Sequence, residues 1–406
     1  MMKTFINIIA VIVTAVLCAS CAGIRSDRGK PYVVMVSLDA FRWDYDSIYS
    51  TPVLDDIAAD GVMAERLIPS FPTKTFPNHY TIATGLYPDH HGIVNNSFYA
   101  PDLDLVYRIG DRAMVGNGAF YGGEPLWVTA RKQGMKTASF YWVGSEAPIE
   151  GMQPDYWKAY DDEVAFADRV DTVLKWLALP AGKRPHFITL YFEEPDAVSH
   201  VYGPISPETG AVVRSLDSLM GDLRTGLASL PIAERINLIV LSDHGMTEVD
   251  WSRYNYIFDT LPEAMVSRMT GGNPVWAVDP AEGMTDSVIY YLNLQHGIKA
   301  WKKEDLPPYL HYGTNQRIPP VVLIADPGWT AGLRPEPSDY SKGNHGYDWK
   351  CPDMHAIFYA EGPAFKKGFS VDTLFNVDVY GLVTDILGLQ PALNDGKKER
   401  VSVLLK

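Results

Sequence analysis

The sequence has little cysteine. Cys18, Cys21 and Cys351 are the only three cysteines in 406 residues, and the first two lie in the N-terminal leader. Because a disulfide needs two thiols, disulfide bonds cannot form the framework of the mature fold. We expect Cys351 to be a buried or half-buried small apolar side chain.

Positive charge is also scarce. Lys and Arg total 35 against 49 Asp and Glu, which gives a formal net charge of −14. A protein that binds nucleic-acid duplexes along their backbone needs clustered cations, so we expect no such partner. A small phosphate-bearing substrate is compatible with this charge, because a bound metal ion can supply positive charge locally.

The N-terminal hydrophobic run is short. Residues 5–17 are apolar, follow Lys3 and precede small residues, whereas a membrane-spanning helix needs ~20 apolar residues. The pattern is typical of a secretory signal peptide, which we assign to residues 1–21. A short polar tether follows at residues 22–30.

The end of this leader resembles a bacterial lipobox. It reads "LCASC", with Cys21 in the position of the acylated residue and Cys18 where Leu is usual. We therefore expect an exported protein of the periplasm or outer membrane, with a lipid anchor at Cys21 as its only membrane contact. A plain cleaved signal peptide is the alternative, and the sequence leaves the oligomeric state open.

Four apolar runs predict buried strands. They read "YVVMVSL", "HFITLYF", "INLIVL" and "HAIFYAE". Continuous apolar runs are typical of strands that are covered on both faces, as in parallel sheets. Helical patterns lie between them at residues 163–179 and 207–230. The alternation predicts an α/β fold with a mainly parallel central sheet.

The segment from about residue 250 to 341 differs from the rest. It is rich in Pro, Gly and aromatic residues, and its strand-like pieces are short: "PVWAVDP", "SVIYYLN" and "IPPVVLIAD". We interpret it as a small α+β insertion or cap.

An acidic residue follows each of three predicted strands. These residues are Asp39, Asp196 and Asp243. In open α/β sheets, ligands bind at the carboxyl ends of the strands, so the three carboxylates are expected to converge. Because they would repel one another there, a metal ion is the usual means of neutralising them.

Three histidines accompany these acids. His200 lies four residues after Asp196, on the same face of a helical turn, and His244 follows Asp243 directly. His345 lies in the loop "GNHGYD". Asp and His together suit Zn²⁺ better than Mg²⁺ or Ca²⁺. Six such ligands fit two metal ions about 3.5–4 Å apart.

Thr75 lies at the start of a helical pattern in "PTKTFPNHYTIATG". Metal coordination would lower the pKa of its hydroxyl and make it a nucleophile. A helix that begins at Pro77 would add backbone N–H groups directed at an anion. We expect Lys74 to be a solvated side chain near this phosphate site.

These segments together resemble the nucleotide pyrophosphatase/phosphodiesterase family, the type I phosphodiesterases of the alkaline phosphatase superfamily. The matching stretches include "SLDAFRWDY", "PTKTFPNHYTIATGLYPDHHGIVNN", "LSDHGM" and "GNHGYD", and they extend from Val33 to about Val383. The resemblance implies an alkaline-phosphatase-like three-layer sandwich. It also implies a single catalytic domain at residues 31–400, with the insertion at about 250–341.

The resemblance implies two Zn²⁺ ions per chain. Their expected ligands are Asp196, His200 and His345 for one ion, and Asp39, Asp243, His244 and the Thr75 oxygen for the other. The family usually has Gly where this chain has Ala40. We expect this change to require only a local backbone adjustment.

The resemblance also implies residues for catalysis and substrate binding. Thr75 would attack phosphorus and form a covalent phospho-threonine, while Asn96 and the Thr75 N–H would hold a phosphate oxygen. Phe76 and Tyr160 match aromatic residues that bind the nucleobase, and Tyr191 is expected near them in the substrate site. The implied reaction is hydrolysis of phosphodiester or pyrophosphate bonds of nucleotides, which releases a nucleoside 5′-monophosphate.

Other activities remain as alternatives. A phosphomonoesterase of the same superfamily needs a cation near the nucleophile, but "FPNHYTIATG" and residues 142–146 contain no Lys or Arg. The diester is therefore favoured. Cleavage of lipid or choline phosphodiesters stays open, because aromatic residues could enclose a choline cation. A non-catalytic surface lipoprotein is disfavoured, because such a protein would be expected to lose some of the metal ligands.

Overall fold

The computed structural model describes residues 29–337 and 340–406. The predicted signal peptide, Cys21 with its anchor, and the tether up to residue 28 lie outside the described residues. Among the helices that are described, none is long and apolar enough to cross a membrane.

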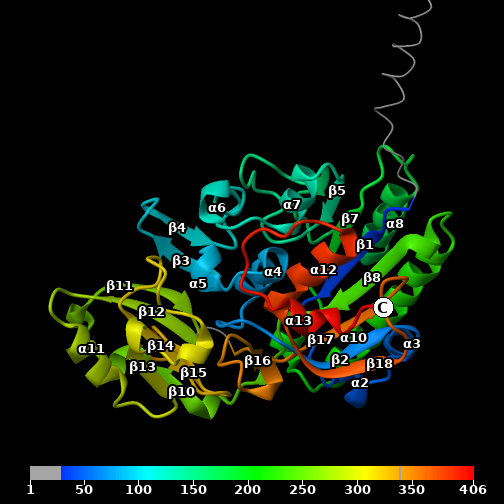
Figure 1. The fold of residues 1–406 in the computed structure, drawn as a ribbon. Helices are drawn as coiled ribbons and strands as arrows, with labels where there is room; N and C mark the ends of the chain where they lie inside the picture. Colours follow the sequence, from blue (N-terminus) through cyan, green and yellow to red (C-terminus); the bar gives the residue numbers. More distant parts are fainter. Residues whose placement is uncertain (1–28, 338–339) are drawn as a thin grey trace, which may run out of the picture.

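An eight-stranded central sheet forms the middle of the molecule (Figure 1). Its strands are parallel to their neighbours except β17, which runs antiparallel to both β2 and β8. In sheet order the strands are β18 (Phe369–Phe375), β2 (Val62–Ile68), β17 (Ala356–Glu361), β8 (Ile236–Leu241), β1 (Tyr32–Leu38), β7 (Phe187–Phe192), β5 (Thr137–Phe140) and β6 (Tyr156–Lys158). The four predicted strands are confirmed, as is the mainly parallel sheet.

Helices cover both faces of this sheet. Along β1, Val33 and Met35 face one hydrophobic core, while Val34 and Val36 face the other. This alternation is the two-residue period of a strand, and it explains why the strand sequence is apolar throughout. The helices on the first face are α4 (Thr75–Thr84), α7 (Leu126–Lys132) and α12 (Val379–Leu387); those on the second are α3 (Pro52–Asp60), α8 (Phe166–Leu177) and α10 (Pro207–Ala228). Helices, sheet and helices make three layers.

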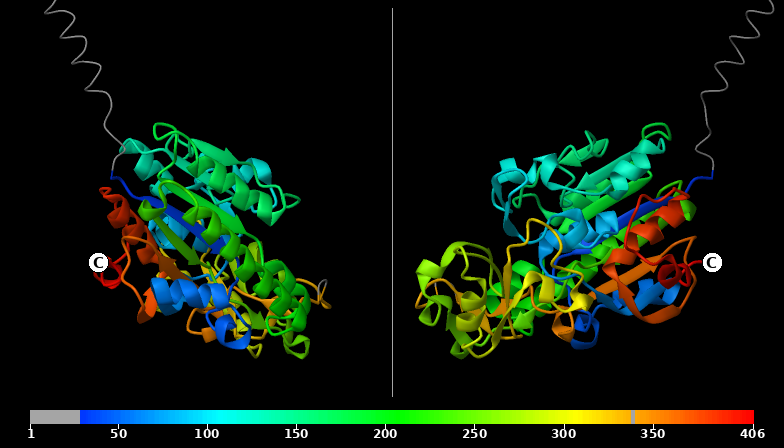
Figure 2. Two further views of the ribbon diagram at one scale, coloured as in Figure 1. Left: turned by 90° about the vertical axis from the view of Figure 1, so that its right-hand side faces the viewer. Right: turned by 60° about the vertical axis from the view of Figure 1, so that its left-hand side comes forward.

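A second sheet with a core of its own lies beside the central sheet (Figures 1 and 2). Its four antiparallel strands are, in order, β11 (Val266–Gly272), β12 (Val275–Pro280), β14 (Val321–Ala325) and β13 (Ile298–Lys302). Cys351 is a free, half-buried thiol that packs against this core, in line with the expectation from the sequence. The structure thus has an α+β unit within the predicted insertion; the boundaries at 250 and 341 stay a prediction.

The predicted strand "SVIYYLN" is wrong. These residues form helix α11 (Thr285–Leu292), which packs on β13 and β14. Its β-branched and aromatic residues suggested a strand. Val288 and Leu292, four residues apart, are both fully buried on one side, so burial of a helical face outweighs the local preference.

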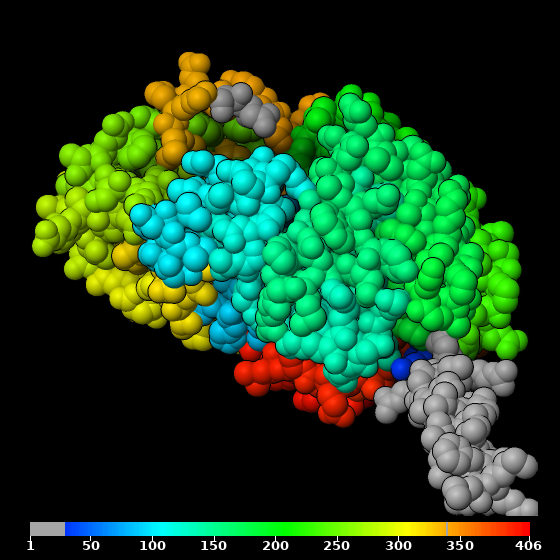
Figure 3. Space-filling model, turned by 90° about the horizontal axis from the view of Figure 1, so that it is seen from above, coloured from blue at the N-terminus to red at the C-terminus, as the bar shows by residue number. Residues whose placement is uncertain are grey.

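Short elements join these parts. They are α2 (Tyr45–Ile48), α5 (Pro88–His91), α6 (Arg112–Val115), α9 (Asp196–Tyr202), α13 (Lys398–Ser402) and the paired strands β3 (Ser97–Ala100) with β4 (Leu105–Arg108), β9 (Thr247–Glu248) with β16 (Gly343–Asn344), and β10 (Tyr254–Tyr256) with β15 (Thr330–Gly332). The hairpin β3–β4, cyan in Figure 3, lies against β11 of the second sheet. It therefore links the insertion to the loop that follows α4 and α5.

His91, behind α4, should make folding sensitive to acid. Its Nδ1 accepts the Ile93 N–H at 3.1 Å, and its Nε2 lies 3.2 Å from the Pro77 carbonyl, so Nε2 carries the single proton. Burial lowers the pKa of His91 from 6.5 to about 3. The unfolded chain therefore binds this proton more readily, and the stabilisation present above pH 6.5 is lost as the pH falls toward 3. At pH 5 the loss should be about 2 kcal/mol.

Urea unfolding at pH 7 and pH 5 measures this effect. His91→Gln keeps an N–H donor but cannot titrate, so its free energy of unfolding should change less between the two pH values. His90→Gln is the matched control, because it makes the same substitution at the neighbouring histidine, whose side chain is 52% exposed. An identical acid response in wild type and His91→Gln would refute the assignment to His91.

Candidate active site

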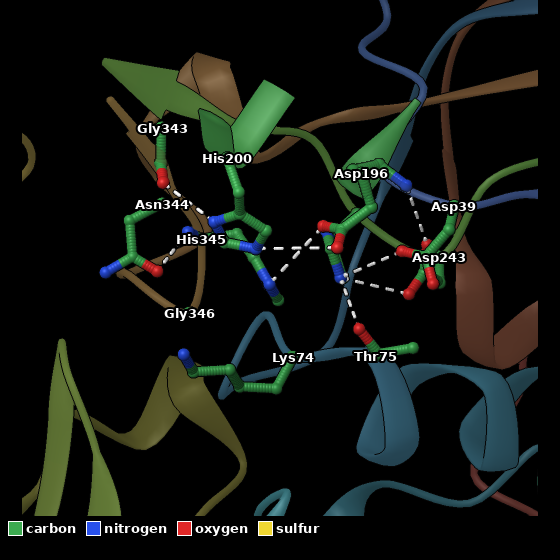
Figure 4. Close-up of polar contacts among 12 residues, drawn as sticks. Asp39, Lys74, Thr75, Asp196, His200, Asp243, Gly343, Asn344, His345 and Gly346 are labelled. Carbon is green, nitrogen blue, oxygen red and sulfur yellow. Dashed lines mark hydrogen bonds and ion pairs between the residues drawn. The ribbon is translucent and has the colours of Figure 1, made fainter. Parts of the chain in front are cut away.

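Thr75 is the first residue of helix α4. Lys74 precedes the helix with an extended backbone (φ −114°, ψ 151°), and its own side chain does not cap the first turn. The prediction that the helix begins at Pro77 is wrong by two residues, since Pro77 lies within the first turn, where its missing N–H has no helical partner to lose. The Thr75 hydroxyl therefore lies at the positive end of the helix, as drawn in Figure 4.

The three predicted carboxylates converge in front of Thr75 (Figure 4). Asp39 follows β1, Asp243 follows β8 and Asp196 is the first residue of α9. Each has one buried oxygen that accepts no hydrogen bond: Asp39 Oδ1, Asp196 Oδ1 and Asp243 Oδ2. Buried carboxylate oxygens without partners are costly, so this arrangement fits positively charged ligands that these oxygens would bind.

The three predicted histidines share one hydrogen-bond arrangement. Nδ1 of His200 lies 2.8 Å from the Gly343 carbonyl, Nδ1 of His244 lies 2.8 Å from the Gly245 carbonyl, and Nδ1 of His345 lies 2.9 Å from the Thr73 carbonyl. A carbonyl can only accept, so each Nδ1 carries a proton. The other nitrogen, Nε2, faces the carboxylates in all three residues, and it is the nitrogen that a metal ion would bind.

Distances divide these residues into two adjoining groups. Asp196 Oδ2 lies 3.4 Å from His200 Nε2, and Asp196 Oδ1 lies 3.6 Å from His345 Nε2; these three residues could hold one ion. We call them the first group. His244 Nε2 lies 3.5 Å from Asp39 Oδ1, 3.0 Å from Asp243 Oδ2 and 3.1 Å from Thr75 Oγ. We call Asp39, Asp243 and His244 the second group. Two other sets of three also lie close enough to hold an ion, Asp39 with Asp196 and His244, and Asp39 with His79 and Asp243, so the division of ligands between two ions stays a prediction.

The carboxyl pKa values reflect this crowding. The pKa of Asp39 is raised well above its usual value, first by burial and then by the charges of Asp243 and Asp196. Burial also acts to raise the pKa of Asp196, but His200, His345 and His244 outweigh it and the net shift is downward. The surroundings thus disfavour the ionised form of Asp39 in particular, a cost that a divalent cation would offset.

His79 belongs to this site and was missed from the sequence. It lies on α4 one turn after Thr75, fully buried, with Nδ1 2.9 Å from the Thr75 carbonyl and 3.2 Å from Asp243 Oδ2. Because the carbonyl only accepts, Nδ1 carries a proton and His79 supports Asp243 rather than binding a metal. Nε2 then accepts from the Ser37 hydroxyl at 2.9 Å. The four-residue spacing from Thr75 was the one available signal.

The residues predicted for substrate binding do not all contact one another. Asn96 Oδ1 accepts the Phe76 N–H at 3.1 Å, which holds the Asn96 amide beside the first turn of α4. Tyr191 donates to Asp39 Oδ2 at 2.6 Å, and its ring centroid lies 6.5 Å from that of Tyr160. Phe76 packs edge-on against Tyr107 instead. Among the described residues no ring contact joins Phe76 to the two tyrosines, so base stacking by the three stays a prediction.

Lys74 is buried, so the expectation of a solvated side chain is wrong. Only 8% of the residue is exposed, and its Nζ donates to the Asn273 carbonyl at 2.7 Å. The side chain runs away from Thr75 toward Asn344 and Gly346 (Figure 4). The Lys74 side chain can take this course only because residue 346 is glycine, since a Cβ at Gly346 would lie 2.4 Å from Lys74 Cε.

Ala40 occupies a backbone conformation that favours glycine. Its φ is +56°, and its N–H donates to Asp243 Oδ1 at 3.3 Å. Alanine adopts this left-handed conformation at a cost of about 1 kcal/mol. The backbone adjustment expected at this position is therefore a strained backbone conformation. Ala40 follows Asp39 directly and donates its N–H to Asp243, so it links two carboxylates of the second group.

A three-layer α/β sandwich with Asp and His groups at the carboxyl ends of its strands defines the class: this is an alkaline-phosphatase-like fold. Solved structures agree. Murine ectonucleotide pyrophosphatase/phosphodiesterase 5, solved as an inactive variant in complex with AMP, superposes with a TM-score of 0.88 at 34% identity, covering 93% of this chain and 100% of that one. The human protein of the same name also has a TM-score of 0.88 at 34% identity, covering 92% and 99%.

The chain belongs to the type I phosphodiesterase/nucleotide pyrophosphatase family, whose family model matches residues 33–348. Human ectonucleotide pyrophosphatase/phosphodiesterase family member 1 is 38% identical over 390 residues, which are 93% of this chain and 42% of that protein. A venom phosphodiesterase of Crotalus durissus collilineatus is 38% identical over 405 residues, 96% of this chain and 48% of that protein. The chain thus spans less than half the length of these curated relatives.

Proposed function

We propose that this protein is a zinc-dependent nucleotide pyrophosphatase/phosphodiesterase that releases a nucleoside 5′-monophosphate through a phospho-threonine. The observation that carries the proposal is the set of three histidines whose Nδ1 atoms are held by carbonyls and whose Nε2 atoms face three partly unpaired carboxylates, beside a threonine at a helix start. Neutral imidazole and carboxylate with no thiolate suit Zn²⁺. Family membership supports the same activity.

The proposed roles follow from position. Two Zn²⁺ ions, held by the first and second groups, would lower the pKa of the Thr75 hydroxyl and offset the charge of the phosphate. Thr75 Oγ, at the second group, attacks phosphorus. The first turn of α4 directs backbone N–H groups at the phosphate oxygens, where the helix dipole favours negative charge. Water then replaces Thr75 on phosphorus and regenerates the hydroxyl.

Asn96 is proposed to donate its amide N–H to a phosphate oxygen. Asn96→Ala should lower kcat by about 10²–10³, the usual loss for one such donor, with a smaller change in KM. Asn96→Asp separates this role from a structural one, because it keeps the acceptor for the Phe76 N–H but removes the donor. Steady-state kinetics that find Asn96→Asp close to wild type would exclude the donor role.

A substrate panel tests the proposed function. The purified protein should prefer bis-p-nitrophenyl phosphate and ATP to p-nitrophenyl phosphate and to a lysophospholipid, ranked by kcat/KM. The alternative, a phosphomonoesterase, needs a cation on the phosphate. Lys74 is the cation next to Thr75 in sequence, yet its Nζ is bound to the Asn273 carbonyl. Faster turnover of the monoester than of the diester would favour the alternative, and lysophospholipid as the best substrate would favour a lipid phosphodiesterase.

We also propose that the protein is exported and held by a lipid on Cys21. The sequence of the leader supports this. In the native host or a bacterial host, Cys21→Ser should move the protein from the membrane fraction to the soluble fraction. Equal partition of both chains would reject the anchor.

A further inference from the structure

Thr73 is a fully buried residue two positions before Thr75, and it binds the loop that carries His345. Its hydroxyl donates to the Tyr347 carbonyl at 2.9 Å and accepts the Gly346 N–H at 2.9 Å. Its carbonyl accepts from His345 Nδ1 at 2.9 Å. Three consecutive residues after β16 are therefore held by one residue, which was not predicted from the sequence to belong to the site.

The chain around Thr73 is also fixed from the side of α4. Asn78, fully buried on this helix, donates from Nδ2 to the Pro72 carbonyl at 2.9 Å and to the Lys74 carbonyl at 2.8 Å. Lys74 is extended, so the Cα atoms of residues 73 and 75 lie about 7 Å apart. Thr73 is thus a rigid link between the helix that carries the proposed nucleophile and the loop that carries a proposed metal ligand.

The loop depends on this link because its own backbone is permissive. Gly346 has a φ of +112°, and glycine restricts the backbone less than any other residue. Beyond it, Tyr347 is fixed, because it is buried in the core of the second sheet and its hydroxyl donates to the Trp329 carbonyl at 2.8 Å. The bonds to Thr73 hold the residues between β16 and Tyr347, so they determine where His345 Nε2 points (Figure 4).

The second group has supports of its own. The Gly245 carbonyl accepts from His244 Nδ1, and the Tyr191 hydroxyl donates to Asp39 Oδ2. Among the described residues, no hydrogen bond joins the Thr73 side chain to this group. Removal of the Thr73 hydroxyl should therefore affect the two groups unequally, whereas a general loss of stability would affect both.

We propose that Thr73 is a positioning residue that directs His345 Nε2 and so sets the affinity of the first group for Zn²⁺. The inference rests on the proposed function, because it takes Zn²⁺ as the ion that this group binds. Mutation of the partners of metal-binding histidines typically lowers metal affinity by about 10–100-fold. Thr73 acts through the loop, and no bond is made or broken at it.

Zinc titration of the metal-free protein against a competing chelator tests the proposal. Wild type should bind two ions, and Thr73→Val should weaken one of them by about 10–100-fold and leave the other unchanged. Thr73→Ser keeps the hydroxyl and should restore wild-type binding. In a His345→Ala protein, Thr73→Val should cause no further loss, because its effect passes through His345.

Thr129→Val is the matched control for the loss of a buried hydroxyl. Thr129 is also fully buried, and its Oγ1 lies 2.8 Å from the Tyr380 hydroxyl, far from the loop that carries His345 in the sequence. Thr129→Val should therefore bind both ions like wild type, even if its melting temperature is lower.

Each outcome decides the question. Equal weakening of both ions by Thr73→Val overturns the inference, and so does an undiminished loss in the His345→Ala protein. If Thr73→Val does not fold, Thr73→Cys replaces it, because a thiol is a weaker hydrogen-bond partner, and the same ion should be weakened by a smaller factor. A wild-type protein that binds no zinc would refute the proposed function itself, whereas two ions of unchanged affinity in Thr73→Val would remove this inference alone.

Discussion

Replacing Thr75 by alanine should abolish turnover while the metal stays bound. The substitution removes the nucleophile, so kcat should fall by at least about 10⁴, as for the nucleophiles of other hydrolases that form covalent intermediates. Each group keeps its three proposed ligands, and the Nδ1 hydrogen bonds of the three histidines do not involve the Thr75 side chain. Elemental analysis should therefore still find two zinc equivalents per chain.

Thr75→Ser is the matched control for this prediction. It keeps a hydroxyl at the same position of α4, so it should retain far more activity than Thr75→Ala. Acid quenching during turnover should trap phosphate on residue 75 of wild type, which mass spectrometry can detect. A Thr75→Ala protein with wild-type kcat would remove Thr75 from the mechanism. Loss of both activity and zinc would instead give Thr75 a role in building the site.

The convergence of the three carboxylates could be predicted from sequence because strand ends place them. Asp39, Asp196 and Asp243 follow buried strands β1, β7 and β8, which are adjacent in the sheet. Parallel neighbours bring their carboxyl ends to one edge, so three residues far apart in sequence meet without further information. The helical spacing from Asp196 to His200 added the first histidine.

Other features depend on contacts between segments that are far apart in sequence. Lys74 is buried because Asn273 and Gly346 come from the second sheet and from the loop after β16. His79 acts through Asp243, which lies on another strand end. No local pattern reports such tertiary contacts, and the short helix α11 was missed because its residue types favour a strand.

Removing the metal should lower both the activity and the melting temperature of the protein. Chelation should reduce activity by at least about 10⁴, and added Zn²⁺ should restore it. It should also lower the melting temperature, because a ligand that binds only the folded state stabilises it. Failure to find bound zinc after purification without chelator would contradict the two-ion proposal.

In the chelated protein, Asp39→Asn should raise the melting temperature at pH 7. The pKa of Asp39 is raised in the folded state, by burial and by Asp243 and Asp196, so its ionised form destabilises the fold at neutral pH and a neutral amide relieves that cost. Tyr191 can still donate to the amide oxygen. By the same linkage, the contribution of Asp39 to unfolding stability in wild type falls as the pH rises above 3.8.

Asp196→Asn is the matched comparison, and its shift should have the opposite sign. Although burial opposes it, the net pKa shift of Asp196 is downward because of His200, His345 and His244, so its charge stabilises the fold without metal. With Zn²⁺ present, both variants should melt below wild type and both should lose activity. Thermal melts of the two variants, each in chelator and in Zn²⁺, measure the four melting temperatures, which are compared with those of wild type. If both variants destabilise the chelated protein equally, the carboxylates do not repel one another as their burial and spacing indicate.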